Sequence, residues 1–523
     1  MATNQQNSTA PEMKKTLSLM GLTINAMALI APGAFLWLTF QLQAAQVDPS
    51  GVSTAPDIWT GLFLALILSF LTAASYSWLS RRYPDAGAGS SYYFAQRALL
   101  DRGSSNKTAR NAKFLVGWLS HLYYWIYPGV MVAMMGFFIT YILSTVGIII
   151  PTLTQVAVVV AFSVAVGFIA YRGINGSTKT NLMINILQIG MLVGVTGIIL
   201  AYRFINPEHV SFVFSNPGSI VLPSSASHML FQATIAILVL VGFESVTAFT
   251  SEAKNPKDVP KAIMLSLIIQ GGFCYLLGYY GLQAWMNSNY GFSAAAASGS
   301  PLGDIIIRSV NSLFGGGGFI VMIMVAAIVA TAILGTTLSC MNTGVRVTYA
   351  ISHDTEVPEP LGKLNPRYGT PAVGVWVMTL VSAGIGAFGV LSLTNLTAVT
   401  LLSNFGTFLL YGITCIVAVL AFKNERRSVL KKYVVPLAGF AANVVMLVAV
   451  IWLGVIGGGG TQTAALMAIG VTAIWIVAGL AYFALNSRSK ESRIFPFPGR
   501  EQEKDKLVKY SITGGAGKDD SYN

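Results

Sequence analysis

One ionisable residue lies inside a long apolar segment. Glu244 follows Gly242 and Phe243 in the run VGFES of residues 241–245. A charge in the hydrocarbon of a bilayer is costly, so an ionisable residue at that depth is a functional candidate by default. Two compatible roles follow for Glu244: a proton-responsive switch, or a carboxyl group that hydrogen-bonds backbone donors at an interrupted helix.

The first apolar segment is also interrupted, at the run LIAPGA of residues 29–34. Pro32 lacks a backbone N–H and Gly33 permits a positive φ, so we expect the helix to break there. Unpaired backbone groups at membrane depth are tolerated only where they line a cavity or are buried in protein. The alternative is that Pro32 only kinks a packed helix, but the matching interruption before Glu244 favours a pair of breaks.

Two broken helices offer complementary backbone groups. A half-helix that begins after a break presents free N–H groups and a positive dipole end to an anion, and one that ends at a break presents free carbonyl groups to an ammonium. A zwitterionic α-amino acid satisfies both. The first and sixth segments begin two five-helix halves, and broken helices at matched positions are typical of inverted-repeat transporters.

The composition excludes a soluble protein. Of 523 residues, 54% are hydrophobic and 10% are charged, whereas soluble domains carry roughly a quarter charged residues. The net charge of +12 does not indicate nucleic-acid binding, because Lys and Arg lie in short connections and tails. Cys274, Cys340 and Cys415 are isolated in apolar segments, so we expect neither a metal site nor a disulfide framework.

The apolar runs predict an all-α polytopic membrane protein with about twelve spans of some twenty residues each. The predicted spans are 17–41, 58–79, 114–146, 153–170, 181–202, 228–250, 262–286, 317–349, 372–393, 396–422, 434–455 and 464–485. If both termini are cytoplasmic, the outer connections hold only Arg203 and Arg308, and the other basic residues of the connections fall inside, as the positive-inside rule requires. The segment 301–313 is too short to cross the membrane, and we expect it to form a helix on the outer surface.

Four motifs resemble the amino acid, polyamine and organocation (APC) superfamily of permeases. They are the Pro-Gly break at 32–33; YPDAG at 83–87 with SYY at 91–93; GFE at 242–244 with EAKNPK at 252–257 and PKAI at 260–263; and RVTYA at 346–350 with Ser352 and Asp354. The resemblance implies the leucine-transporter-like fold, a five-plus-five inverted repeat with broken helices 1 and 6. It implies cytoplasmic tails at 1–16 and 486–523, repeats at 17–202 and 203–422, and two further helices at 423–485.

In this superfamily, backbone atoms at the two breaks hold the substrate. By resemblance, the site residues here are Ala31, Pro32, Gly33, Ala34, Leu238, Val241, Gly242 and Phe243. Pro32 departs from the small or polar residue often found there, so one possible donor to a substrate carboxylate is missing. Met27 extends the apolar lining of this site.

The third predicted span is rich in aromatic residues. Helical spacing allows His121, Tyr124 and Trp125 to share one face, and Tyr123 and Tyr127 to share another. Only one face can look at a central cavity, and we assign Tyr124 to the site. Packing or anchoring at the membrane interface is the alternative for each of them.

The coupling ion stays open between proton and sodium. Thr336 and Thr337 in the eighth span could place hydroxyl groups where sodium-coupled relatives bind an ion, although hydroxyl groups also hold helices together. Some proton-coupled relatives carry a Lys in the fifth span, where this chain has Gln188.

These features predict a secondary transporter of amino acids, by proton-coupled symport or exchange, in a bacterial inner membrane. The apolar lining and single deep carboxyl group favour a neutral amino acid over a polyamine, which is the alternative substrate. A channel or membrane-embedded enzyme fits less well, because broken helices suit alternating access and no nucleophile, base or metal-ligand set is evident. We expect no cofactor, no metal and no nucleic-acid partner.

Overall fold

The computed structural model describes residues 17–30, 32–173, 178–206, 210–353, 357–423 and 428–486. Twelve helical stretches in this part of the chain are long and apolar enough to cross a membrane. Extended pairing within it is confined to isolated bridges such as that between Leu17 and Ala253. The all-α polytopic fold predicted from the sequence is therefore confirmed, with twelve candidate spans.

The described spans combine α-helices with shorter 3-10 and π-helical pieces. The α-helices are α1 (Leu19–Ile30), α2 (Pro32–Ala44), α3 (Ile58–Arg82), α4 (Ser91–Leu100), α5 (Asn106–Tyr124), α6 (Tyr127–Thr145), α7 (Thr152–Arg172), α8 (Thr178–Ile205), α9 (Ala226–Ala236), α10 (Val259–Ser266), α11 (Leu276–Trp285), α12 (Phe292–Ala297), α13 (Pro301–Phe314), α14 (Gly318–His353), α15 (Ala372–Gly389), α16 (Leu393–Phe422), α17 (Val435–Ile456) and α18 (Gly459–Asn486). The other pieces are η1 (Ala55–Asp57), η2 (Pro84–Gly89), η3 (Pro217–Val221), η4 (Ile237–Val239), η5 (Phe243–Glu252), η6 (Pro256–Asp258), η7 (Leu267–Tyr275), η8 (Glu359–Gly362) and η9 (Leu430–Val434).

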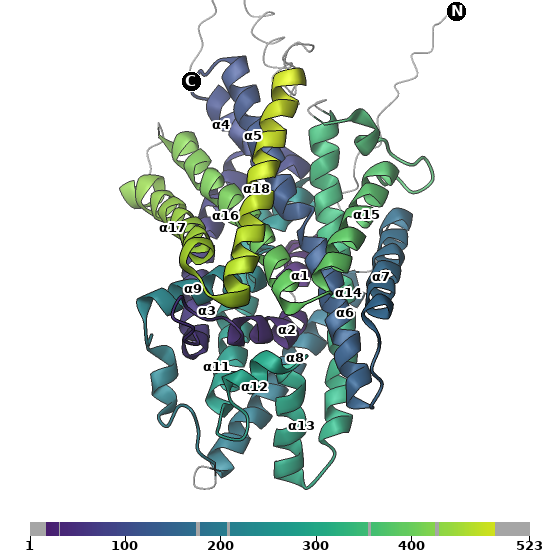
Figure 1. Cartoon of the computed structure of the whole chain (residues 1–523). Coiled ribbons are helices and arrows are strands. Elements are labelled where there is room, and N and C mark those ends of the chain that lie inside the picture. Colours follow the sequence, from purple (N-terminus) through teal and green to yellow (C-terminus); the bar gives the residue numbers. More distant parts are fainter. Residues whose placement is uncertain are drawn as a thin grey trace, which may run out of the picture.

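The long helices form one elongated bundle with two ends (Figure 1). One end carries α4, the start of α5 and the end of α18, and we call it the α4 face. The other carries α11, α12 and α13, and we call it the α13 face. Apolar side chains on the flanks, such as Leu380 and Ile474, are well exposed, as expected of a surface that faces lipid tails.

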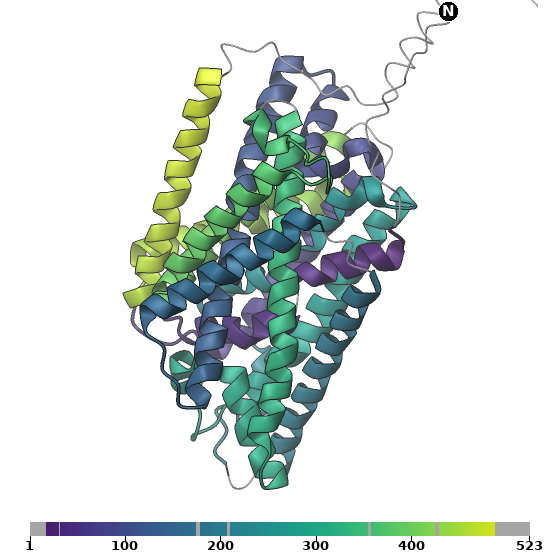
Figure 2. The same ribbon diagram turned by 90° about the vertical axis from the view of Figure 1, so that its right-hand side faces the viewer.

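The first span is divided between α1 and α2. Helix α1 ends at Ile30 and α2 begins at Pro32, whereas Ala31 lies outside the described residues. Figure 2 shows the two as separate purple segments at different heights along the bundle. Proline is well suited to the first position of a helix, because the N–H it lacks would have no partner inside the helix.

The sixth span is divided more extensively. Helix α9 ends at Ala236, and the chain passes through η4 and a turn before it continues as the 3-10 helix η5. Gly242 in that turn has φ +120°, a conformation that is strained for residues with a Cβ atom. The glycine therefore permits the interruption that the sequence predicted here.

The structure contains two interruptions that the sequence analysis did not predict. The third span is divided between α5 and α6 around Trp125 and Ile126, and Pro128 lies in the first turn of α6. The seventh span contains the π-helix η7 between α10 and α11. π-Helical turns frequently occur at functional sites, because they rotate the side chains that follow.

The predicted surface helix at 301–313 is present as α13 on the α13 face. Its inner side is buried, with Leu302, Ile305 and Ile306 packed against the bundle. The carboxylate of Asp304 in its first turn accepts hydrogen bonds from three hydroxyl groups that lie outside this helix, those of Tyr141, Tyr290 and Ser298. The helix is thus fixed to α6 and to the loop before it.

Candidate functional site

Hydroxyl groups from distant helices meet the carbonyl oxygens at the end of α1. Thr336 of α14 donates to the carbonyl oxygen of Ala28 at 3.0 Å, and Tyr275 of η7 donates to that of Ile30 at 2.5 Å. A helix end leaves its last carbonyl groups without partners inside the helix. These two hydroxyl groups satisfy carbonyl groups that the break leaves inside the bundle.

Tyr127 connects the two broken spans. Its hydroxyl oxygen lies 3.5 Å from the carbonyl oxygen of Leu29 in α1 and 3.3 Å from that of Leu238 in η4. Gly242 closes the same junction, since a Cβ atom on it would lie 2.6 Å from the Cβ atom of Leu29. The two breaks are therefore in contact at one place in the bundle.

Glu244 lies beside this junction and is fully buried. Its Oε2 atom accepts hydrogen bonds from the backbone N–H of Gly242 at 3.0 Å and from the hydroxyl of Tyr411 at 2.6 Å. Its Oε1 atom accepts no hydrogen bond of ordinary geometry among the described residues, although the hydroxyl of Tyr123 lies close enough to interact with the carboxyl group. Both donors point at Oε2, so Oε1 is the atom that can hold a proton.

An aromatic cluster surrounds the Glu244 carboxyl group. The ring of Phe243 lies 5.3 Å from that of Tyr411 and 6.2 Å from that of Tyr76. Within the described residues, Glu244 forms no ion pair. Any compensation of its charge must therefore come from hydrogen bonds, a bound proton or a bound cation.

The third span contributes aromatic residues on more than one face, and Tyr124, which the sequence analysis assigned to the site, lies beside Tyr123 with their ring centroids 4.6 Å apart. Tyr123 and Tyr127 face Glu244 and the breaks, whereas His121 and Trp125 face α14, where both contact the hydroxyl of Thr348. Tyr124 lines a small cavity beside the segment from 89 to 92, with Ser120, Val347 and Leu410. Tyr123 and Tyr127 thus share one face, and His121 and Trp125 share another, as their helical spacing suggested, although the span is divided between α5 and α6.

Most other residues that the sequence analysis assigned to the site have buried side chains. Met27, Ala34, Leu238 and Val241 are all buried. Ala31 lies outside the described residues, and of Pro32 only the backbone is described. Gly33 lies against α8, because a Cβ atom on it would be 2.9 Å from the Cε atom of Met191.

The three ion-site candidates occupy distinct positions. The hydroxyl of Thr336 bridges α14 and α1, whereas that of Thr337 donates to Ile333 within its own helix at 2.7 Å. Gln188 is buried near Gly33, and its Oε1 atom has no partner among the described residues. No group of three His, Cys, Asp or Glu in the described chain could hold a metal ion.

Several contacts close the bundle on the α4 face. The segment before α1 pairs with the segment after η5: the N–H of Leu17 donates to the carbonyl of Glu252 at 2.9 Å, and the N–H of Lys254 donates to that of Leu17 at 2.8 Å. Arg346 of α14 forms an ion pair with Glu252 at 3.0 Å and lies over the ring of Phe249. These contacts tie the segment before α1 to η5 and to α14.

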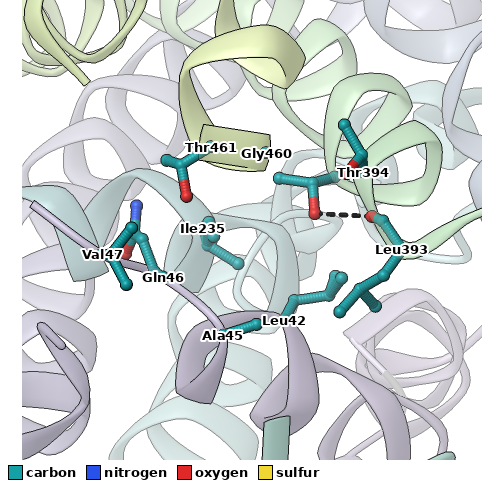
Figure 3. A pocket seen from close by; sticks show the side chains of 10 residues that line it. Leu42, Ala45, Gln46, Val47, Ile235, Leu393, Thr394, Gly460 and Thr461 are labelled. Atoms are coloured by element: carbon teal, nitrogen blue, oxygen red, sulfur yellow. Dashed lines mark hydrogen bonds between the residues drawn. The ribbon is translucent and has the colours of Figure 1, made fainter. Parts of the chain in front are cut away.

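A cavity of about 100 Å³ lies toward the α13 face (Figure 3). Residues at the end of α2, together with Ile235 of α9, form one side, and the first turns of α16 and α18 form the other. Its lining residues are Leu42, Ala45, Gln46, Val47, Ile235, Leu393, Thr394, Thr397, Gly460 and Thr461. The second half of the first span and the first half of the sixth span thus border this cavity.

A cluster of His228 and two carboxylates joins the segments beside this cavity. His228 at the start of α9 lies 3.1 Å from the carboxylate of Asp48, which follows α2, and 3.7 Å from that of Asp57, which precedes α3. Hydrogen bonds from the Ser50 side chain and from His228 lower the pKa of Asp48 to about 2. Asp48 is therefore ionised at neutral and mildly acidic pH.

Twelve apolar spans with two broken helices that meet beside a buried carboxyl group define a multi-pass membrane protein with an enclosed polar site. The sequence profile of the amino acid permease family matches residues 15–481, and the chain belongs to this family. The four motifs and the twelve spans are thus those of an APC-superfamily permease, as the resemblance implied.

Similar proteins of known name are transporters. The low-affinity putrescine importer PlaP of Escherichia coli K12 is 24% identical over 492 residues, 92% of this chain and 96% of that protein. The branched-chain amino acid permease BcaP of Bacillus subtilis is 25% identical over 433 residues, 79% and 82% of the two chains. The methylthioribose transporter of Bacillus subtilis is 22% identical over 455 residues, 83% and 87% of the two chains. The protein is a membrane transporter and not an enzyme.

Proposed function

We propose that this permease moves a neutral α-amino acid across the membrane by alternating access. The observation that carries the proposal is the junction of the two breaks, where carbonyl groups of Leu29 and Leu238 converge on one hydroxyl group. Carbonyl oxygens suit a substrate ammonium, and the N-terminal turn of α2 offers a positive dipole end to a carboxylate. Met27 and Val241 supply apolar surface for an uncharged side chain.

The distribution of the protein's carboxyl groups favours a substrate with one amino group over a diamine. Within the described spans, Asp57 and Asp258 lie within three residues of a span end, and only Glu244 lies deeper. A diamine would place its second cation several ångströms from the first and would require a second acceptor at depth. Putrescine transport is the second candidate, because a relative that covers most of the chain is named a putrescine importer.

We further propose proton coupling through Glu244, by symport or exchange. Its Oε1 atom accepts from neither Gly242 nor Tyr411 and can hold a proton, while its Oε2 atom accepts a hydrogen bond from the N–H of Gly242 at the break. A change in the charge of this carboxyl would therefore act directly on the backbone of the broken span. The hydroxyl of Thr336 donates to the carbonyl oxygens of Ala28 and Ala332. This favours a proton over a sodium ion as the coupling ion, because the hydroxyl is already engaged.

The α4 face is proposed to be cytoplasmic. Helix α4 and the start of α5 lie at this end (Figure 1), and Arg97, Arg102 and Lys107 belong to or adjoin them; cytoplasmic connections are enriched in Lys and Arg. In this orientation the contacts of Leu17 and Arg346 close the inner side of a cell-membrane transporter.

The test is thermal stabilisation of the purified protein by a panel of L-amino acids and diamines, followed by uptake into proteoliposomes. A ligand that binds only the folded state raises the unfolding temperature. Stabilisation by leucine or alanine, with uptake that a proton gradient accelerates, would support the proposal. Stabilisation by putrescine alone would replace the amino acid with a diamine.

A further inference from the structure

Three hydroxyl groups form hydrogen bonds with the carbonyl groups at the breaks, but these hydrogen bonds differ in length and in the number of acceptors. Thr336 and Tyr275 each face one carbonyl of α1, at 3.0 and 2.5 Å, and Thr336 also donates to Ala332 in its own helix at 2.8 Å. Tyr127 faces two, at 3.5 Å from Leu29 and 3.3 Å from Leu238. A phenol has one hydrogen, so it can donate fully to only one of them at a time.

The hydrogen bonds of Tyr127 are also the longest of the set. Hydroxyl-to-oxygen bonds are usually about 2.7–2.8 Å long, so the contacts at 3.3 and 3.5 Å are weak. The ring is held from both sides, by the stacked ring of Phe35 at 6.0 Å and by the ring of Tyr123 at 5.5 Å. The hydroxyl is therefore placed by ring packing at a point between two acceptors that it satisfies only partly.

An ammonium group fits this position better than a phenol. It carries three donors and a full charge, and charge-assisted hydrogen bonds are shorter and stronger than neutral ones. The two acceptors come from different broken spans, one from α1 and one from η4. An ammonium that donated to both would hold the two breaks together.

We propose that the hydroxyl of Tyr127 stands in for the substrate ammonium in the empty transporter and competes with it for the carbonyl groups of Leu29 and Leu238. This inference rests on the proposed function and adds an affinity-setting residue to it. The hydroxyl leaves when an amine enters and returns when the amine departs. The empty site thus keeps a donor at carbonyl groups whose burial without one is costly.

The competition has two consequences. The substrate must displace an existing donor, so the hydroxyl lowers the affinity for amines. The same hydroxyl stabilises the empty, closed transporter, which must form whenever the protein returns without cargo. Tyr127 therefore favours net uptake over obligatory exchange, at the expense of affinity.

The test compares the wild type, Tyr127→Phe and a matched control, Tyr279→Phe. Tyr279 is also a buried phenol near the first span, but its hydroxyl contacts the side chain of Thr39 at 2.7 Å. Binding of radiolabelled L-leucine and L-alanine is measured on purified protein. Net uptake into empty proteoliposomes is compared with exchange into proteoliposomes loaded with the same amino acid.

Tyr127→Phe should bind the amino acid about 3- to 10-fold more tightly, as expected for the loss of one competing hydrogen bond. Its net uptake should fall relative to exchange, and Tyr279→Phe should leave both the affinity and this ratio unchanged. Displacement by 4-methyl-2-oxopentanoate, which resembles leucine but lacks the amine, should not become stronger in Tyr127→Phe.

Each other outcome overturns a distinct statement. If the wild type binds leucine or alanine and Tyr127→Phe binds it equally or more weakly, the hydroxyl is no competitor and the inference fails, while the proposed function stands. Equal tightening for the oxo acid would show that the position is not an ammonium site. If the wild type binds neither amino acid, the proposed function fails and the inference fails with it.

Discussion

Gly242 lies directly against Leu29, so that a methyl group on the glycine would sit 2.6 Å from the Cβ atom of the leucine. This contact joins the interrupted first and sixth spans at the level of Glu244. It depends on a residue without a side chain for two reasons, the proximity of Leu29 and the φ of +120°.

Gly242→Ala should reduce uptake at least tenfold, because the added methyl group separates the breaks and a positive φ adds a strain of about 1–3 kcal/mol. Initial uptake rates in proteoliposomes, normalised to the amount of folded protein, measure the effect. Gly272→Ala in η7 is the matched control, since nothing lies within 4 Å of its Cβ position. Wild-type uptake by Gly242→Ala would show that the contact is dispensable.

Gly33 should tolerate alanine but not valine. The nearest atom to a Cβ at this position is the terminal carbon of Met191 at 2.9 Å, a flexible group that can move by a few tenths of an ångström. A branched side chain would also meet Gln188. We expect ligand-induced thermal stabilisation to persist in Gly33→Ala and to be lost in Gly33→Val, with Gly194→Val, which faces open space, as the control. Equal stabilisation of all three variants would remove Gly33 from the site.

Glu244→Gln should flatten the pH dependence of uptake, when uptake is measured from about pH 5 to about pH 8. The amide oxygen can still accept from Tyr411 and from Gly242, so the hydrogen bonds persist while the titrating proton is lost. Asp48→Asn is the control at another carboxyl group. Because its pKa is about 2, Asp48 stays ionised throughout this range, and any stability its charge contributes would be lost only as the pH fell from about 4 toward 2. An unchanged profile in Glu244→Gln at normal expression would exclude its proton role.

Asp304→Ala should lower the stability of the protein by about 1–3 kcal/mol. The substitution leaves the hydroxyl groups of Tyr141, Tyr290 and Ser298 without their acceptor, and both tyrosines are largely buried. Thermal unfolding in detergent, followed by intrinsic fluorescence, measures the change. Asp304→Asn keeps one acceptor oxygen and should lose less; a larger loss in the asparagine variant would contradict this account.

The sequence predicted the positions of the spans well, but it did not predict which side chains connect them. Span length follows from bilayer thickness, and the breaks follow from Pro32 and Gly242, which act on their own backbone. The partners of the broken ends are set by packing instead: Tyr275 and Ile30 are 245 residues apart. The division of the third span between α5 and α6 was also not predicted, although Pro128 in the first turn of α6 is of a type that interrupts helices.

The backbone pairing of Leu17 with Glu252 and Lys254 bears on how the transporter opens. Two backbone hydrogen bonds and the Arg346–Glu252 ion pair all involve the short stretch from Glu252 to Lys254. If the transporter opens on the α4 face, as proposed above, these bonds must break in that motion. We expect their rupture to slow opening, so that at saturating cargo the turnover would be limited by the lifetime of these contacts.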